Sequence, residues 1–470
     1  MSAALDPSHS ALPPETSARS APGPVLDRLR ASFYAGHTRG LAWRREQIGG
    51  LRRMLREDRD ALVAALRDDL GKTEIECVGG ELAQAVFEAR FAQRHLQAWT
   101  RPERIGPLSL PGRRSVHREP RGIVLVASPW SHPVGLLLAP LASALAAGNC
   151  VVLRPPSTAA HTAALLARLV PRHLDPHAVA LVEGDEDTTL ALLEGGVDHV
   201  FYTGNGRAGR LVMVAAARSG TAITAELVGK SPCLVDADVD VREAARLLAR
   251  AKFTNAGQTC AAPDYLLVHE RREQELIQEL RRAVVALHGG DPVRSPSYGR
   301  IADPQRSAAL AALLGEGEVL WGGEARLEEG YVAPTLLRGV APDSPLLSAD
   351  LLGPILPLFP VADMTEAIDF VNDREPPLAL YVFSDDEDVQ ELALEQTRSR
   401  GVCVNGIPHV ADRALPVGDI GASGVGSHHG MRGFETFSHS KSVLDRSRGE
   451  SRRLYPAYTR LKTKLLYWRL

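Results

Sequence analysis

The feature that most constrains this fold is a regular alternation of short apolar runs and helix-like segments between residues 122 and 227. The apolar runs are rich in β-branched residues and have glycine or proline near their ends, which is typical of buried strands. The expected strands are 123–127, 150–153, 179–182, 199–202 and 222–225, and the expected helices are 134–147, 158–169, 188–193 and 207–218. This order predicts a parallel, Rossmann-like sheet with helices on both faces, which binds ligands at the carboxyl ends of its strands.

The sequence on either side of this region predicts further parts. Residues 26–99 carry leucines at helical spacing with charged residues between them, so we expect helices there. Residues 100–121 are rich in Pro, Gly and Arg and predict an excursion of the chain, such as a hairpin arm. From residue 228 onward, helix and strand patterns alternate again, which indicates a second α/β domain.

Size and charge limit the classes of protein. The chain has 470 residues, of which 44% are apolar, enough for two or three domains with a core each. The 54 basic and 57 acidic residues give a net charge of −3, so no general attraction to nucleic acid is expected. The five cysteines are scattered, which argues against disulfides or a thiolate metal site and for a reducing, cytoplasmic compartment. The longest apolar run, 133–148, is too short to cross a bilayer comfortably.

A G-x-G-x-x-G pattern lies at Gly204, Gly206 and Gly209, directly after the fourth expected strand. Such glycines can cradle a pyrophosphate, and an acid about 20 positions further on can hold a ribose. Glu226 has this spacing, but it also follows the fifth expected strand, where a carboxylate can act as a general base for water. A salt-bridged or helix-capping glutamate is a third interpretation, and the residues alone leave all three open.

Cys260 follows the small and polar sequence Asn-Ala-Gly-Gln-Thr. Core cysteines usually have apolar neighbours. Small residues instead let a substrate approach the thiol, and their backbone N–H groups can bind an oxyanion. A nucleophilic thiol is therefore one interpretation of Cys260, and a structural cysteine is the other.

Several motifs occur in order along the chain: A-S-P-W-S-H-P, G-N-C-V-V-L-R-P-P-S, F-Y-T-G-N-G, A-E-L-V-G-K-S-P, N-A-G-Q-T-C-A-A-P-D-Y, L-L-G-P-I-L-P, N-D-R-E-P-P-L-A-L-Y and S-H-H-G-M-R-G-F-E-T-F-S-H. Together they resemble the aldehyde dehydrogenase superfamily, nearest to its dimeric and fatty-aldehyde branch. The resemblance covers about residues 26–443, and the order and spacing of the motifs make it specific. It implies oxidation of an aldehyde to a carboxylic acid with NAD or NADP as the cofactor.

The resemblance also implies roles for the two candidate residues. Cys260 matches the nucleophile, which forms a thiohemiacetal and then a thioester with the substrate. Glu226, 34 positions earlier (260 − 226), matches the base that activates water and not a ribose ligand. The glycine pattern is then partly accidental, although Gly204 still opens a turn beside the cofactor.

One position of the family's catalytic machinery differs. In Trp130-Ser131-His132-Pro133, Ser131 replaces the asparagine that donates a hydrogen bond to the oxyanion. A serine hydroxyl can donate, but its side chain is shorter, and loss of such a donor typically costs about 10²–10³ in rate. A water or His132 could substitute. We therefore expect a slow enzyme, or one specialised for a substrate that brings its own stabilisation.

Positions that the resemblance assigns to the cofactor also differ. Arg154 and Ser157 replace a lysine and an acid near the adenine ribose, which favours a 2′-phosphate, so we expect NADP to be tolerated or preferred. Asp350 replaces the glutamate that binds the nicotinamide ribose, and Leu352 replaces an aromatic residue. The full expected cofactor set is Trp130, Arg154, Ser157, Gly204, Asn205, Gly209, Leu227, Asp350 and Leu352, and we expect no metal.

The expected parts of the chain are a disordered tail at 1–25, an NAD(P)-binding domain at 26–99 and 122–227, a catalytic domain at 228–410, a β bridging and oligomerisation region at 100–121 and 411–443, and a basic amphipathic tail at 444–470. The resemblance implies a homodimer. The basic tail predicts docking on the protein's own body or a partner subunit, or weak contact with an anionic membrane surface.

Three alternatives stay open. The first is an enzyme that passes the thioester to coenzyme A or phosphate, against which Glu226 argues. The second is a slow or inactive homologue, which Ser131 and the replacement of a glycine by Val228 suggest. The third is a membrane-surface binder that uses the basic tail.

Overall fold

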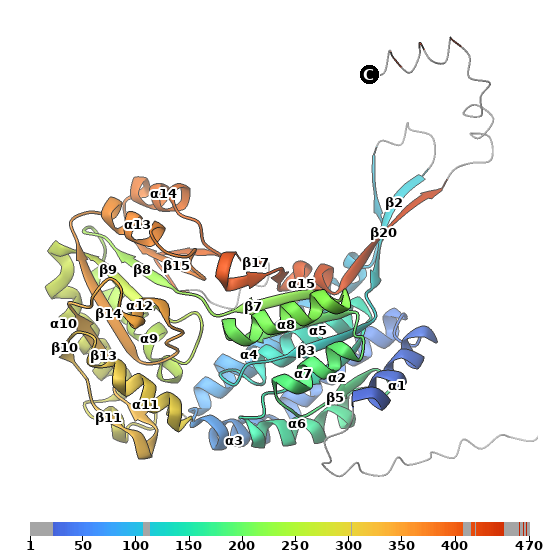
Figure 1. The fold of residues 1–470 in the computed structure, drawn as a ribbon, viewed down its shortest axis with the longest axis horizontal. Helices are drawn as coiled ribbons and strands as arrows, with labels where there is room; N and C mark the ends of the chain where they lie inside the picture. Colours follow the sequence, from blue (N-terminus) through green and yellow to red (C-terminus); the bar gives the residue numbers. More distant parts are fainter. Residues whose placement is uncertain are drawn as a thin grey trace, which may run out of the picture.

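The computed structural model describes residues 22–106, 113–301, 303–407, 415–418 and 420–445, together with the single positions 460, 464 and 467. Two bodies lie side by side, each built around a mostly parallel sheet, and a long antiparallel arm projects from the first (Figure 1). The predicted α/β fold class is confirmed. No helix in the described ranges is both long and apolar enough to span a membrane.

The first body holds a six-stranded sheet with the order β18-β7-β6-β3-β4-β5. Its strands are β3 (Ile123–Ala127), β4 (Cys150–Arg154), β5 (Val179–Leu181), β6 (His199–Gly204), β7 (Ala222–Leu227) and β18 (Gly424–Val425). Its helices are α1 (Pro22–Tyr34), α2 (Leu41–Glu57), α3 (Arg59–Leu70), η1 (Glu76–Leu82), α4 (Ala83–Trp99), α5 (Gly135–Ala147), α6 (Ala160–His173), α7 (Glu186–Glu194), α8 (Gly206–Ser219) and α15 (Gly430–Thr436). β3 to β7 run parallel, as predicted, whereas β18 pairs antiparallel with β7.

The burial of the central strands and of α5 explains why these elements could be predicted from the sequence. All five residues of β3 are buried, because helices cover both faces of the sheet. Helix α5 is apolar on nearly all sides and is buried almost completely, as expected for a helix without a polar face. Gly148 ends α5 with φ +90°, a conformation that suits glycine. These elements hold the carboxyl ends of the strands in fixed positions.

The second body holds a seven-stranded sheet with the order β10-β13-β14-β9-β8-β15-β16, parallel except for β10. Its strands are β8 (Pro232–Val235), β9 (Tyr265–His269), β10 (Glu318–Trp321), β13 (Thr335–Arg338), β14 (Ile355–Val361), β15 (Leu380–Phe383) and β16 (Val402–Val404). Its helices are α9 (Val241–Phe253), η2 (Thr254–Gly257), η3 (Glu270–Arg272), α10 (Glu273–His288), η4 (Pro292–Arg294), α11 (Pro304–Leu313), η5 (Leu327–Glu329), α12 (Pro345–Ser348), α13 (Met364–Asn372) and α14 (Glu387–Gln396).

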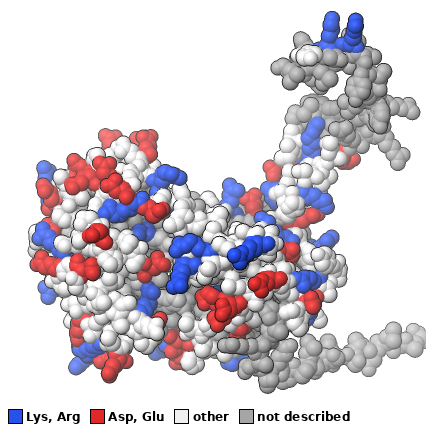
Figure 2. Space-filling model, in the orientation of Figure 1, with Lys and Arg blue, Asp and Glu red and all other residues white. Residues whose placement is uncertain are grey.

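The remaining elements are small. The arm is a three-stranded antiparallel sheet of β1 (Glu103–Arg104), β2 (Arg113–Pro120) and β20 (Ser438–Asp445). Two short ladders join β11 (Ala325–Arg326) to β12 (Tyr331–Val332), and β17 (Val417–Gly418) to β19 (Ser427–His428), and η6 spans Gly421–Ser423. Figure 2 shows acidic and basic side chains interspersed over one face and along the arm, in keeping with the small net charge.

One expectation about the first body needs correction, and one strand of its sheet was not predicted. Helix α1 begins at Pro22, inside the tail expected at 1–25, because Val25 and the following leucine are buried against the first sheet. Strand β18 was not predicted, since a two-residue strand carries no periodic signal. Residues 1–21 lie outside the described residues. The domain limits stay our proposal.

The structure agrees with one prediction about the arm and adds a strand pairing that was not predicted. The excursion at 100–121 contains β1 and β2, and their antiparallel pairing agrees with a hairpin arm. The sequence did not indicate that β20 would pair with β2 along its whole length. The basic tail lies outside the described residues beyond Asp445, except for the exposed positions Arg460, Lys464 and Tyr467.

Candidate active site

A cavity of about 680 Å³ opens where the carboxyl ends of β3, β4, β6 and β7 face loops of the second body. Its volume falls within the range of about 300–1,000 Å³ that is usual for small-molecule sites. Both Cys260 and Glu226 line this cavity, together with Ser131. Because the cavity is bounded by both sheets, residues far apart in the chain can act on one ligand there.

Cys260 is half-buried and follows a strained turn at the end of α9 and η2. Asn255, Ala256 and Gly257 all have positive φ angles, of 52°, 49° and 75°. The Asn255 side-chain amide donates to the carbonyl of Gln258 at 3.0 Å, and the Gln258 amide donates back to the Asn255 carbonyl at 2.9 Å. These bonds hold a left-handed segment that a relaxed chain would avoid, and such strain clusters at functional sites.

The chain around Cys260 is also fixed from the second sheet. The Ser231 hydroxyl donates to the Cys260 carbonyl at 3.3 Å. The Tyr381 hydroxyl donates to the Ala261 carbonyl at 2.6 Å. Tyr381 is fully buried in the second sheet and also lines the cavity. The thiol therefore sits on a loop whose backbone is tied to β8 and β15.

Glu226 is the residue before the last in β7, near the carboxyl end of that strand. Its backbone lies between Thr203 of β6 and Gly424 of β18. The side chain is 8% exposed, and its Oε1 lies 2.9 Å from Nη2 of Arg400. The carboxylate is thus held in the cavity wall by a guanidinium from the other body.

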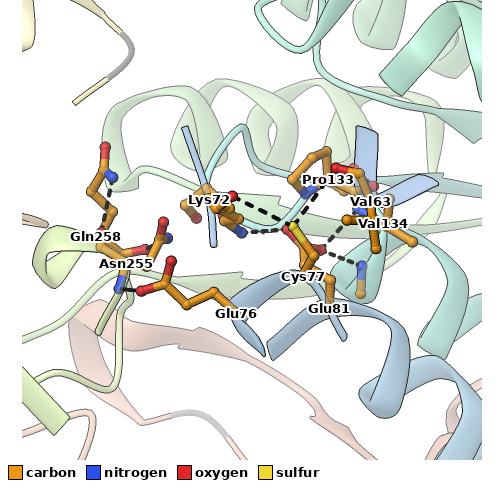
Figure 3. A network of polar contacts seen from close by, with 12 residues as sticks. Val63, Lys72, Glu76, Cys77, Glu81, Pro133, Val134, Asn255 and Gln258 are labelled. Atoms are coloured by element: carbon orange, nitrogen blue, oxygen red, sulfur yellow. Dashed lines mark hydrogen bonds and ion pairs between the residues drawn. The ribbon is translucent and has the colours of Figure 1, made fainter. Parts of the chain in front are cut away.

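The turn that carries Ser131 is supported by a buried ion pair between Lys72 and Glu81 (Figure 3). Nζ of Lys72 donates to the Ser131 carbonyl at 2.7 Å. Oε2 of Glu81 accepts from the backbone N–H groups of Val134 and Gly135, at 3.1 and 2.7 Å. The carboxylate thereby satisfies N–H groups at the start of α5 that have no partner within the helix. The whole turn is fixed from behind the cavity.

A second contact in Figure 3 joins this support to the cysteine loop. Glu76 begins the π-helix η1, and its Oε1 accepts from the Asn255 backbone N–H at 2.5 Å. Its other oxygen accepts from the Thr73 backbone N–H at 2.9 Å. π-helical turns are rare and often mark functional sites. The two loops that carry Ser131 and Cys260 are therefore held by the same segment, 72–82.

His132 also lines the cavity. Burial, and secondly the charge of Lys72, hold the pKa of His132 well below its usual value. Its imidazole is therefore neutral at physiological pH, and a neutral imidazole still carries one N–H that can donate a hydrogen bond.

Arg154 ends β4 and is almost fully buried, with Nε donating to the Thr189 hydroxyl at 3.0 Å. Burial lowers the pKa of its guanidinium, an effect that Glu186 partly offsets. Glu186 also lines the cavity, and its charge acts on Arg154. An acid from α7, which the sequence analysis had not assigned, therefore acts on Arg154 in this part of the cavity.

The glycine pattern divides between two roles. Gly204 and Asn205 line the cavity, and the Asn205 side chain caps α8 by accepting from its backbone at 2.8 Å. Gly209 was expected to bind the cofactor, but it does not belong to the described lining of the cavity. A Cβ at Gly209 would lie 2.2 Å from Leu227, so this glycine serves the packing of α8 on the sheet. Leu227 itself reaches the cavity.

The remaining cofactor candidates meet at the cavity rim. Asp350 accepts from the backbone N–H of Gly206, and partial burial raises the pKa of its carboxyl. Arg306 donates to the Asp350 carbonyl at 3.2 Å and lies 5.0 Å from the ring centre of Trp130. Leu352 has a φ of 39°, a rare conformation outside glycine. The contacts of Arg306 with Trp130 and of Asp350 with Gly206 therefore join the two bodies beside the cavity.

Sequence reasoning missed three charged residues of the described cavity lining: Arg400, Arg306 and Glu186. Each acts on a partner that is remote in the chain, so no local spacing marks it. Only their positions just before a strand or at a helix start gave any signal. No cluster that could hold a metal occurs among the residues that the structure describes.

Comparison with known proteins shows which family this chain resembles. The aldehyde dehydrogenase family profile matches residues 31–443. Human aldehyde dehydrogenase family 3 member B1 is 42% identical over 431 residues, covering 91% of this chain and 92% of the relative. The rat protein named "Aldehyde dehydrogenase, dimeric NADP-preferring" is 38% identical over 426 residues, covering 90% of this chain and 94% of its own.

Solved structures agree with these relatives. The substrate-bound state of Staphylococcus aureus AldH superposes with a TM-score of 0.90 at 33% identity, over 95% of this chain and 98% of that one. An NAD-dependent aldehyde dehydrogenase from Sinorhizobium meliloti superposes with a TM-score of 0.85 at 27% identity, over 93% of this chain and 88% of that one.

The chain belongs to the aldehyde dehydrogenase family. The predicted resemblance, including its family 3 branch, is confirmed. The protein is thus an NAD(P)-dependent oxidoreductase that acts on aldehydes, as the sequence analysis expected. The roles of individual residues stay predictions.

Proposed function

We propose that Cys260 and Glu226 carry out the oxidation of an aldehyde to a carboxylic acid in two stages. The observation that carries this proposal is that both side chains line one cavity, although they come from different bodies. Cys260 is half-buried and so reachable, and a half-exposed thiol on a polar loop suits a nucleophile better than a core cysteine.

In the first stage, the Cys260 thiolate attacks the aldehyde carbon and forms a thiohemiacetal. The developing alkoxide needs hydrogen-bond donors, and we assign this role to the Cys260 backbone N–H, the Ser131 hydroxyl and the neutral His132 imidazole. The proximity of Ser131 and His132 to the same cavity supports the assignment. A bound NAD or NADP would supply the hydride acceptor for this stage, after which Cys260 holds the substrate as a thioester.

In the second stage, Glu226 takes a proton from water, which hydrolyses the thioester. Release of the acid returns Sγ to the thiolate form. A carboxylate that lines the cavity is suited to this step. The alternative of transfer to coenzyme A gains no support from the described cavity, since it retains the carboxylate.

For the cofactor, we assign the carboxyl end of the first sheet. The fit rests on the cavity volume and on the buried Arg154, on which the charge of Glu186 acts. The full proposed set is Trp130, Arg154, Ser157, Gly204, Asn205, Leu227, Asp350 and Leu352. Arg154 can pair with a 2′-phosphate and Glu186 can bond a 2′-hydroxyl, so we expect both NADP and NAD to serve.

The deciding experiment is a panel of aldehydes, scored by formation of the reduced cofactor with NAD and with NADP. Replacement of Cys260 by Ser is expected to lower kcat by at least about 10³, because an alcohol at neutral pH is a weak nucleophile. Iodoacetamide should label Cys260 in the wild type, and bound cofactor should slow the labelling. Full activity of Cys260→Ser would disprove the proposed nucleophile.

We also propose a homodimer in a reducing, cytoplasmic compartment. A relative named as dimeric supports the first part, and five cysteines without a disulfide support the second. Exposed Leu211 and Val214 on α8 offer apolar surface beside the sheet edge at β18.

Weak contact of the basic tail with anionic membranes stays a hypothesis, which liposome sedimentation with and without residues 446–470 can test.

A further inference from the structure

Arg400 reaches across the cavity from the second body to the first. It lies between α14 and β16, in a segment whose backbone is tied to the start of β15. The Arg400 N–H donates to the Pro377 carbonyl at 3.0 Å, and the Leu380 N–H donates to the Gly401 carbonyl at 2.9 Å. The base of the arginine side chain is therefore fixed relative to the second sheet.

The guanidinium of Arg400 meets the carboxylate of Glu226. Nη2 lies 2.9 Å from Oε1, and the two side chains are only 13% and 8% exposed. A charge pair that is shielded from water is stronger than a surface pair, and removal of one partner leaves the other charge exposed to a poorly solvating interior. Arg400 and Glu226 both line the cavity that holds Cys260.

We propose that Arg400 is a positioning residue for the base in the hydrolytic stage. This inference rests on the function proposed above. By binding Oε1, the guanidinium fixes the rotation of the carboxylate, so that the other oxygen, Oε2, accepts the proton of the attacking water. Arg400 does not itself exchange a proton, because a guanidinium stays charged.

The chemical step balances as follows. The water oxygen forms a bond to the acyl carbon, and one water proton passes to Oε2 of Glu226. The C–S bond breaks, and its electron pair returns to Sγ of Cys260 as the thiolate. The carboxylic acid leaves, and Glu226 releases its proton to solvent. Arg400 has no part in the earlier attack of the thiolate, so its loss should affect only hydrolysis.

The test is Arg400→Gln in the full-length protein, with a rapid-mixing assay of cofactor reduction. Slow hydrolysis predicts a fast burst approaching one reduced cofactor per active site, followed by a steady rate at least about tenfold below that of the wild type. The acyl group should accumulate on Cys260 and appear as added mass in intact-protein mass spectrometry. The aldehyde KM is expected to fall together with kcat, because a slow later step traps the intermediate.

Two further variants and one control sharpen the test. Arg400→Lys keeps a charge without the planar fork and should restore part of the steady rate. Glu226→Gln should resemble Arg400→Gln, and the double variant should be no slower than Glu226→Gln alone. The control is Arg338→Gln, which removes an ion pair to Glu273 outside the described cavity lining. In that pair Nε of Arg338 lies 2.9 Å from Oε1 of Glu273. This variant should show neither burst nor acyl-enzyme.

The inference is overturned if Arg400→Gln lowers the burst and the steady rate in equal proportion without acyl-enzyme, or if it leaves hydrolysis unchanged. Additive losses in the double variant would overturn it as well. If Arg400→Gln does not fold, Arg400→Lys is the deciding variant. A steady rate of Arg400→Lys equal to that of the wild type would show that the planar guanidinium is not needed to orient Glu226. Absence of any acyl-enzyme in Glu226→Gln, while Cys260→Ser retains activity, would instead disprove the proposed function.

Discussion

Ser131 holds a position where a longer amide would reach further toward the developing oxyanion. Its turn is fixed by Lys72 and Glu81, so a substitution should alter the donor without moving the backbone. Loss of one such donor usually costs about 10²–10³ in rate, so we expect Ser131→Asn to raise kcat by about 10-fold or more. Steady-state turnover with the best aldehyde checks this.

The same assay tests whether the neutral imidazole of His132 donates a hydrogen bond to the oxyanion. If His132 now supplies the missing hydrogen bond, His132→Leu should lower kcat strongly in the wild type and weakly in Ser131→Asn. Equal losses in both backgrounds, or no gain in Ser131→Asn alone, would show that the serine position does not limit the reaction.

His199 gives a pH prediction at the residue scale. Burial, and secondly Arg121, lower the pKa of His199 to about 3, and neither ring nitrogen has a partner among the described residues. Below about pH 6.5 the unfolded chain binds a proton here that the native protein does not bind until about pH 3. Native stability should therefore fall as pH decreases through this window.

His199→Leu should weaken that dependence, because leucine binds no proton in either state. Urea unfolding at pH 7 and at pH 5 gives the comparison. The exposed His439→Leu serves as a control and should keep the pH dependence of the wild type. An identical fall in stability for His199→Leu and the wild type would contradict this origin.

At the element scale, the left-handed turn before Cys260 requires Gly257. Its φ is +75°, and a Cβ there would lie 2.4 Å from the Gly353 carbonyl oxygen. Gly257→Ala should cost at least about 1–2 kcal/mol of stability from backbone strain alone, and it should displace the cysteine loop and lower kcat/KM.

Gly299→Ala is the matched control, since its Cβ would be no closer than 3.5 Å to its neighbours. Thermal unfolding and kcat/KM should separate the two alanine variants. If Gly257→Ala unfolds and reacts like Gly299→Ala, the turn is more tolerant than its geometry indicates.

At the scale of the whole molecule, the proposed dimer predicts the effect of charges on α8. Leu211 and Val214 are 57% and 51% exposed there. Leu211→Asp combined with Val214→Asp should bring the sedimentation mass down to one chain, because a buried, unpaired carboxylate is costly in an interface. Leu394→Asp, at a site of similar exposure on α14, should stay dimeric. A dimer in the double variant would exclude this face as the interface.

The central strands were predictable because burial imposes β-branched, apolar runs on them. β3 begins and ends where expected, and β6 differs only by a two-residue extension at its carboxyl end. The predicted pair of Cys260 and Glu226 does share one cavity. By contrast, β18 and Arg400 left no periodic signal, since β18 is too short and Arg400 contacts Glu226 from 174 positions away.

The sequence by itself determined the α/β class, the family and the residue types available for chemistry, because periodicity and ordered motifs are local properties of a chain. Only the tertiary structure decided that Gly209 packs a helix, that Glu186 lies beside Arg154, and that Arg400 binds Glu226. The first two contacts depend on how α8 and α7 pack on the first sheet, and the third depends on how the two sheets face each other. No spacing along the chain encodes these distances.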